Sequence, residues 1–230
     1  MKDLGPAKKI LGMQLHRDRK AGTLFLSQEE YIRRVIDKFG MANSKPVQTP
    51  LAPYFRLSDQ LCPRTEAEKY EIMKIPYASV VGCLMYVMVL TRPDLSYAMS
   101  VVSRYMANPG KEHWRVVKWI LKYLNGTTTY GLIYGGQRQD DSQIVGYVDF
   151  DYARDLDRRR SLTRYLFTFN NCIVNWKAQL QSVVALSTTE AEYTAAAKVV
   201  KEVIWLRGML QELGIDQRSI PKCYIKVLYL

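Results

Sequence analysis

The sequence predicts an α/β fold in which a helical module precedes a small mixed sheet carrying one long helix. Hydrophobic residues repeat with the 3.6-residue period of a helix between Ile75 and Tyr123, and with a period near two after residue 142. A helix with a start signal at Ser187 and a stop signal at Gly214 then separates two strand-like segments. Because a strand–helix–strand connection favours parallel strands, the strands before and after this helix should be parallel.

Length and composition describe a globular chain with a basic surplus. The 230 residues suffice for one or two domains, and 48% hydrophobic and 24% charged residues exclude a disordered tail, a collagen repeat and a disulfide-stapled miniprotein. The 33 Lys and Arg residues against 22 Asp and Glu residues give a net charge of +11. This surplus favours a polyanionic partner such as nucleic acid, and a basic solvated surface without a partner is the equally open alternative.

The sequence favours an intracellular location, in the cytoplasm or the nucleus. The N-terminal residues lack the apolar core of a secretory signal, and the apolar run from Val80 to Leu90 is too short to span a bilayer. The four cysteines lack the Cys-x-x-Cys spacing of a zinc site, so we expect free thiols in a reducing compartment. No membrane partner is expected, and the sequence does not indicate an oligomeric state.

The N-terminal elements are a hairpin, a helix and an extended segment. Gly22 in the polar loop between two short apolar stretches, 11–15 and 23–26, predicts the hairpin. Ser27 and Glu30 have the spacing of a capping box, and Gly40 is a typical helix stop, so a helix is expected between them. Three prolines between residues 46 and 53 then predict an extended strap and a first boundary.

Three helices are expected in the helical module. The first and second are separated by Arg92-Pro93, the second ends at Pro109-Gly110, and the third ends at Asn125-Gly126. Their apolar stripes, in chain order, are Tyr77, Val80, Val81, Leu84, Met85 and Met88; Leu95, Met99, Val102 and Met106; and Trp114, Val117, Ile120, Leu121 and Leu124. The polar stretch 135–142 is the second boundary.

The second half reads as three strands, a long helix and a fourth strand. The strand-like segments are 144–149, 165–169, 172–177 and 224–230. Asn170-Asn171 lies between the second and third and predicts a two-residue hairpin turn. The long helix opens with Ser187 and Glu190, which have capping-box spacing.

Two pairs of carboxylates are the candidates for chemistry. Asp149 and Asp151 share one face of a strand, where aspartate is unfavourable unless it lies at the strand end or binds something. Glu190 is explained by capping, and Glu192 lies in the first turns of the helix, where the dipole favours negative charge. Carboxylates from a strand and a helix start suit two-metal phosphodiester hydrolysis, and a solvated strand end is the equally open alternative. Two acidic groups alone do not decide between them.

The chain resembles the Pol polyprotein of copia-type LTR retrotransposons over essentially its whole length. Many blocks match in the right order, which makes the resemblance highly specific. The blocks are Lys2 to Gly12, Leu26-Ser-Gln28, Thr49-Pro-Leu51, Tyr77 to Tyr86, Thr91-Arg-Pro-Asp-Leu-Ser-Tyr-Ala98, Val102 to Met106, Leu124 to Thr127, Gly146 to Asp151, Leu186-Ser-Thr-Thr-Glu-Ala-Glu-Tyr193 and Ile204 to Gly208.

The resemblance implies three segments: 1–50 as the C-terminal tail of a reverse transcriptase, 51–135 as a helical thumb/connection segment, and 142–230 as a truncated ribonuclease H-like domain. It implies that Asp149 and Glu192 are two of four catalytic carboxylates that hold Mg²⁺ in the intact family and that lie close together. The polymerase aspartates would precede this chain and the last two nuclease carboxylates would follow Leu230. Arg154 and Arg164 stand where the family usually has glycine.

The resemblance therefore implies a Pol fragment descended from an enzyme acting on RNA–DNA hybrid, with catalytic activity lost and Mg²⁺ bound weakly or not at all. The alternative is a non-catalytic basic module that binds nucleic acid through Arg158, Arg159 and Arg160 and the thumb helices. A secreted effector is disfavoured because no signal is present in the sequence.

Overall fold

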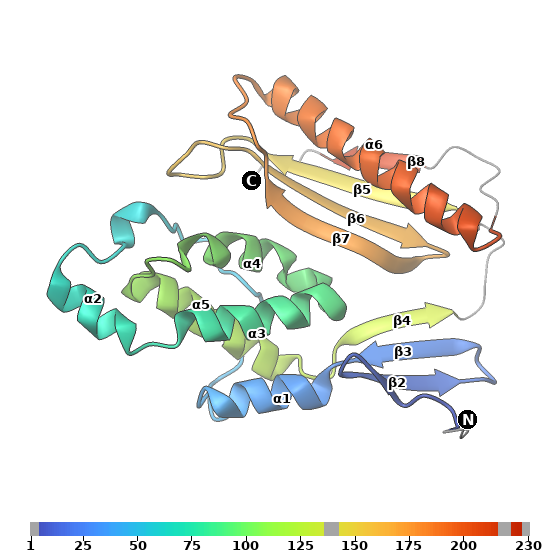
Figure 1. The fold of residues 1–230 in the computed structure, drawn as a ribbon, viewed down its shortest axis with the longest axis horizontal. Coiled ribbons are helices and arrows are strands. Elements are labelled where there is room, and N and C mark those ends of the chain that lie inside the picture. Colours follow the sequence, from blue (N-terminus) through green and yellow to red (C-terminus); the bar gives the residue numbers. More distant parts are fainter. Residues whose placement is uncertain (1–4, 136–142, 216–221, 227–230) are drawn as a thin grey trace. The chain divides into compact units, whose positions relative to one another are not determined.

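The computed structural model describes residues 5–135, 143–215 and 222–226, and it divides into two compact units, Met1–Ile133 and Tyr134–Leu230 (Figure 1). We call them unit 1 and unit 2. The described residues form two four-stranded sheets and six α-helices, which confirms the mixed α/β class. Apart from its last residues, which begin unit 2, the segment 51–135 lies in the same unit as 1–50.

Unit 1 combines a sheet with a bundle of helices. Its strands, in spatial order, are β1 (Lys9–Ile10), β2 (Met13–Asp18), β3 (Thr23–Ser27) and β4 (Gly131–Gly135). Its helices are α1 (Glu29–Lys38), α2 (Glu66–Met73), α3 (Tyr77–Leu90), α4 (Ser96–Val102) and α5 (Lys111–Gly126), with 3-10 turns at Asp59–Leu61, Pro93–Leu95 and Ser103–Tyr105. Strand β4 was not predicted. It requires glycine at Gly131, because a Cβ there would lie 2.2 Å from the Leu26 carbonyl oxygen of β3.

The predicted start of α1 is wrong in detail. Gln28, and not Ser27, is the N-cap residue, and no side chain caps the helix. The Ser27 hydroxyl instead donates to Gln14 on β2, and the Glu30 carboxylate accepts from Lys9 and Gln14. The stop is confirmed: Gly40 has a φ of +66°, and its N–H donates to a carbonyl in the last turn of α1.

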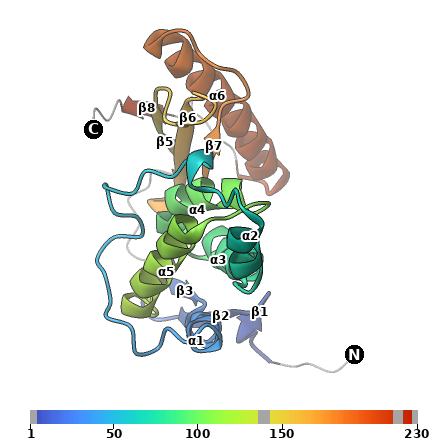
Figure 2. The same ribbon diagram turned by 90° about the vertical axis from the view of Figure 1, so that its left-hand side faces the viewer.

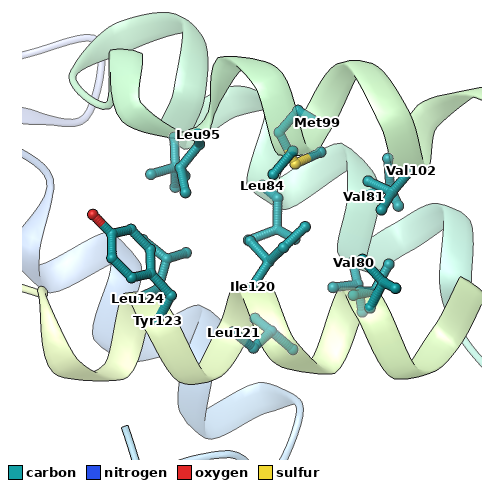
Figure 3. Close-up of a cluster of buried hydrophobic side chains, with 14 of the residues drawn as sticks. Val80, Val81, Leu84, Leu95, Met99, Val102, Ile120, Leu121, Tyr123 and Leu124 are labelled. Carbon is teal, nitrogen blue, oxygen red and sulfur yellow. The ribbon is translucent and has the colours of Figure 1, made fainter. Parts of the chain in front are cut away.

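The core of unit 1 forms where α3, α4 and α5 meet, together with one face of α1 (Figure 3). Most of the predicted stripes are buried there. Met88 and Trp114 are half-buried, and Met85 and Met106 are exposed, whereas Val87 and Tyr105 are buried. Among the described residues no single helix is long and apolar enough to cross a membrane. Helices α2 and α3 are long and apolar enough only when they are taken together, and the chain bends between them.

Arg92 is buried beside this core, with 1% of its surface exposed. Its guanidinium donates to both carboxylate oxygens of Asp94 at 2.6–3.2 Å, to the Thr127 carbonyl at 2.8 Å and to the Thr127 hydroxyl at 2.7 Å. The Tyr123 hydroxyl donates to the same carboxylate, and the Tyr123 and Tyr130 rings lie 5.4 Å from the guanidinium. These contacts tie the α3–α4 turn to the end of α5.

Unit 2 is a mixed sheet with one long helix on it. The strands are β5 (Ile144–Asp151), β6 (Leu162–Phe169), β7 (Cys172–Leu180) and β8 (Lys222–Lys226), in the spatial order β7-β6-β5-β8. Strands β5, β6 and β7 are antiparallel neighbours, and β8 pairs in parallel with β5. The strand after the helix therefore has the predicted direction, with β5 rather than β7 as its neighbour. Residues 227–230 of the predicted last strand and 136–142 of the predicted boundary lie outside the described residues.

The long helix α6 (Thr188–Glu212) covers one face of this sheet (Figure 1). Its buried residues Ala191, Ala195 and Val199 pack with Val148 and Phe150 of β5 and with the β6 aromatic residues Tyr165 and Phe167. The predicted turn between β6 and β7 is confirmed, because Asn170 and Asn171 have φ values of +50° and +60°.

Candidate functional site

Asp149 and Asp151 lie near the end of β5, on the face of the sheet that points away from α6. Their even-numbered neighbours Val148 and Phe150 pack with α6, and side chains alternate along a strand. Asp149 is directly opposite Arg164 in the β5–β6 ladder. The antiparallel register therefore places a long cationic side chain beside both carboxylates.

Arg164 forms ion pairs with both aspartates. Its Nη2 contacts Asp149 Oδ2 and lies 3.2 Å from Asp151 Oδ2. The three side chains are mostly buried, with 15%, 14% and 23% of Asp149, Asp151 and Arg164 exposed. One guanidinium against two carboxylates leaves this cluster with one formal negative charge. Arg164 thus engages one oxygen, Oδ2, of each carboxylate.

The pKa of Asp151 is raised above its ordinary value. Burial is the largest cause, because it penalises the charged carboxylate, and the Asp149 charge raises the pKa further. Arg164 and Arg154 act in the opposite direction without reversing the shift. The positive charge of Arg164 therefore compensates only part of what the burial of this carboxylate costs.

Glu190 and Glu192 lie at the start of α6. The Ser187 hydroxyl accepts from the Glu190 N–H at 3.1 Å, so Ser187 caps the helix as predicted. The Glu190 carboxylate accepts from the Leu186 N–H at 2.7 Å, one residue before the N-cap, and not from the Ser187 N–H of a capping box. Glu192 is half-buried on α6. This helix packs against one face of the sheet, and Asp149 lies on the opposite face. Within the described ranges no group of three or more His, Cys, Asp or Glu side chains is placed to hold a metal ion.

Arg158, Arg159 and Arg160 belong to the loop between β5 and β6. The loop is closed by its own backbone: the Asp155 N–H donates to the Arg160 carbonyl at 3.0 Å, and the Arg159 N–H donates to the Asp155 carbonyl at 2.9 Å. Arg158 and Arg159 are exposed and Arg160 is half-buried. The arrangement presents at least two guanidinium groups to solvent from a backbone held in one conformation.

The positive charge is distributed unevenly between the two units. Residues 1–133 contain 20 of the 33 Lys and Arg residues and 11 of the 22 Asp and Glu residues, and so carry +9 of the net charge of +11. Unit 2, which holds the carboxylates and the arginine loop, carries only +2. Any general attraction for polyanions is therefore concentrated on unit 1.

Sequence reasoning missed the pairing of Arg164 with Asp149. Arg164 stood out only as a departure from the family's glycine. The signal was present in the strand itself, because Arg164 shares its face of β6 with Leu162 and Leu166 and interrupts an apolar row. The β5–β6 register decides which residue lies beside Arg164 and neutralises its charge. That register pairs residues on either side of a ten-residue loop.

Comparison with known proteins identifies relatives along nearly the whole chain, whereas no family model and no solved structure matches it. It is 56% identical to the retrovirus-related Pol polyprotein from transposon TNT 1-94 of Nicotiana tabacum, over 95% of this chain and 16% of that polyprotein. It is 34% identical to an uncharacterized mitochondrial protein of Arabidopsis thaliana, over 89% of this chain and 80% of that protein.

A third relative is the secreted RxLR effector protein 161 of Plasmopara viticola, which is 45% identical over 57% of this chain and 92% of its own length. The chain spans only 16% of the Nicotiana tabacum polyprotein, so it corresponds to one part of such a protein. The matches agree with the resemblance carried by the sequence blocks. The chain belongs to the family of retrovirus-related Pol polyproteins from transposons.

Proposed function

We propose that this chain is a Pol segment of ribonuclease H descent that binds nucleic acid, including RNA–DNA hybrid, without cleaving it. The observation that carries the proposal is the position of Arg164, whose guanidinium contacts both Asp149 and Asp151. In the intact family, carboxylates of this kind hold Mg²⁺, and the ion supplies the charge stabilisation for phosphodiester hydrolysis.

The described residues do not fit a resident Mg²⁺ ion. Mg²⁺ requires near-octahedral oxygen ligands, and Arg164 already engages one oxygen, Oδ2, of each of Asp149 and Asp151. The two aspartates come from one strand and approach from one direction, and no third carboxylate completes a group with them among the described residues. The described residues therefore do not support metal-dependent hydrolysis.

Nucleic-acid binding is supported by charge and exposure. The net charge of +11 attracts a polyanion, and Arg158 and Arg159 are exposed on a loop that is closed by backbone hydrogen bonds. Contacts between such groups and phosphates release counterions, so they give binding that is independent of sequence and sensitive to salt. This interaction requires neither a metal ion nor a catalytic carboxylate.

A labelled RNA–DNA hybrid tests both parts of the proposal. Purified 1–230 should bind the hybrid at low salt, lose affinity steeply as salt increases, and leave the RNA strand intact in Mg²⁺ or Mn²⁺. The Asp149→Asn variant is the matched control for contaminating nuclease. Cleavage by the wild type that disappears in Asp149→Asn would overturn the loss of activity, and no binding at low salt would overturn the binding function.

A further inference from the structure

The outer face of α5 is basic along most of its length. Lys111, Arg115, Lys118 and Lys122 follow one another at spacings of four, three and four residues, which places them on one face of the helix. The opposite face is buried in the core of unit 1. With a rise of about 1.5 Å per residue, the last three cations span ~10 Å of the helix axis.

Two of these cations form no ion pair with any described residue. Neither Lys118 nor Lys122 has an ion-pair partner within the part of the chain that the structure describes. Arg115 lies 3.5 Å from Glu112, and 65% and 48% of these two side chains are exposed. Such a pair at the surface is weak and exchanges readily for a phosphate. Lys111 Nζ is 2.6 Å from a Glu71 carboxylate oxygen, so its charge is already paired.

A strap between α1 and α2, residues 42–57, runs beside α5 (Figure 2). The Asn125 side-chain amide donates to the Ala42 and Ser44 carbonyls at 3.1 and 3.0 Å, and the Trp119 indole N–H donates to the Thr49 carbonyl at 2.9 Å. Two positions on α5 therefore hold the strap: Asn125 near the carboxyl-terminal end of the helix and Trp119 in its middle.

The strap places an aromatic cluster next to the cations. The rings of Tyr54 and Phe55 pack edge-on against Trp119, with centroids 6.0 and 5.5 Å away, and Tyr54 is 62% exposed. Trp119 lies four residues after Arg115 and three before Lys122, so all three side chains are neighbours on the helix surface. The result is an exposed ring, held by other rings, beside a row of positive charges.

We infer that this surface binds single-stranded nucleic acid, with a base stacked on Tyr54 and the phosphates contacting Arg115, Lys118 and Lys122. Aromatic rings beside a cationic track recognise unpaired bases, because a duplex keeps its base faces covered. The inference rests on the nucleic-acid binding proposed above and assigns it a place on unit 1, which carries most of the charge.

Fluorescence anisotropy with an unstructured labelled oligonucleotide tests the assignment on the whole chain. The R115Q/K118Q/K122Q variant should lose most of the affinity, and the slope of log affinity against log salt should decrease by about 2 units. The K177Q/K201Q/R207Q variant removes three positive charges from exposed positions of unit 2 and should retain most of the affinity. Equal losses in both variants, or a larger loss in the second, would overturn the assignment to α5.

Tyr54 separates stacking from charge. Tyr54→Ala should weaken binding of the single strand about tenfold, which corresponds to ~1.4 kcal/mol, and should leave the affinity for duplex unchanged. Tyr54→Phe keeps the ring and should bind as the wild type does. If Tyr54→Ala binds the single strand normally, the stacking site is wrong. If the wild type binds no nucleic acid at low salt, the proposed function fails and this inference fails with it.

Discussion

Arg92 in unit 1 and Arg164 in unit 2 are both held by aspartates, but their surroundings differ in the balance of charge. Arg92 forms an ion pair with one carboxylate, that of Asp94, and also donates hydrogen bonds to the carbonyl and hydroxyl of Thr127. Arg164 meets two carboxylates from a single strand. The first arginine completes a neutral, hydrogen-bonded junction, whereas the second offsets surplus negative charge. A buried arginine can therefore belong to the fold or can substitute for another cation, and its partners distinguish the two roles.

The largest expected effect comes from removing the arginine of unit 1. Arg92→Met should lower the free energy of unfolding by about 3–5 kcal/mol, because it leaves the Asp94 charge and the Thr127 carbonyl without their partner. Hydrogen exchange measured by mass spectrometry should show that the substitution speeds up amide exchange in α4 and α5 more than in β5 and β6. Arg115→Ala, at an exposed position on α5, is the control and should change stability little. Unchanged exchange in Arg92→Met would contradict the role of the junction.

A smaller effect is expected from removing the arginine of unit 2. Arg164→Gly frees the oxygens of Asp149 and Asp151, and Mg²⁺ can bind through one or two carboxylates while keeping several waters. Millimolar Mg²⁺ should then raise the thermal midpoint of the variant, by an amount equivalent to roughly 1–3 kcal/mol when the ion is well above its Kd.

Two controls sharpen that measurement. Arg164→Lys keeps a positive charge beside the aspartates and should not respond to Mg²⁺, and neither should the wild type. The double variant R164G/D149N should lose the response that Arg164→Gly gains. A wild type that is stabilised by Mg²⁺ as strongly as Arg164→Gly would show that the guanidinium does not take the place of a cation.

The smallest expected effect is a difference in pH dependence between the two units. Burial raises the pKa of Asp151, so the folded state binds its proton more tightly than the unfolded state does. Its contribution to stability is complete below the unfolded pKa of about 3.9 and is lost as the pH rises through the folded value. In unit 1 the pKa shifts are in the opposite direction. Lys9 lowers the pKa of Glu30, backbone N–H groups lower that of Glu68, and Lys111 lowers that of Glu71.

Urea titrations between pH 3 and pH 7 measure this difference. As the pH falls, the wild type should gain stability relative to Asp151→Asn, because only the wild type has the group that takes up the proton. A gap between wild type and Asp151→Asn that stays constant with pH would rule out titration of Asp151 in this range.

The parts of the fold that sequence predicted well are those set by local chemistry. Ser187, Glu190 and Gly214 bracket α6 because capping and a left-handed glycine depend only on residues within one turn. Asn170-Asn171 gives the β6–β7 hairpin for the same reason, since asparagine tolerates positive φ at both turn positions. The mixed class followed from the change of hydrophobic period.

The parts that sequence missed depend on residues far apart in the chain. Ser27 and Glu30 have the spacing of a capping box, but Lys9 and Gln14 on other strands engage the Glu30 carboxylate instead. The basic face of α5 was visible as a spacing of four, three and four, but the aromatic cluster beside it appears only once the strap lies on the helix. The pairing of Arg164 with Asp149 likewise depends on strand register.

The pairing of β4 with β3 has a consequence for the order of events during synthesis. Strand β3 ends at Ser27, and its partner begins at Gly131, about 100 residues later. At ~5–20 residues per second, a ribosome needs roughly 5–20 seconds to deliver the second strand after the first. During that interval one edge of the β1–β3 sheet lacks its native neighbour and can pair with another strand. Nascent chains of unit 1 should therefore depend on chaperones until β4 has emerged.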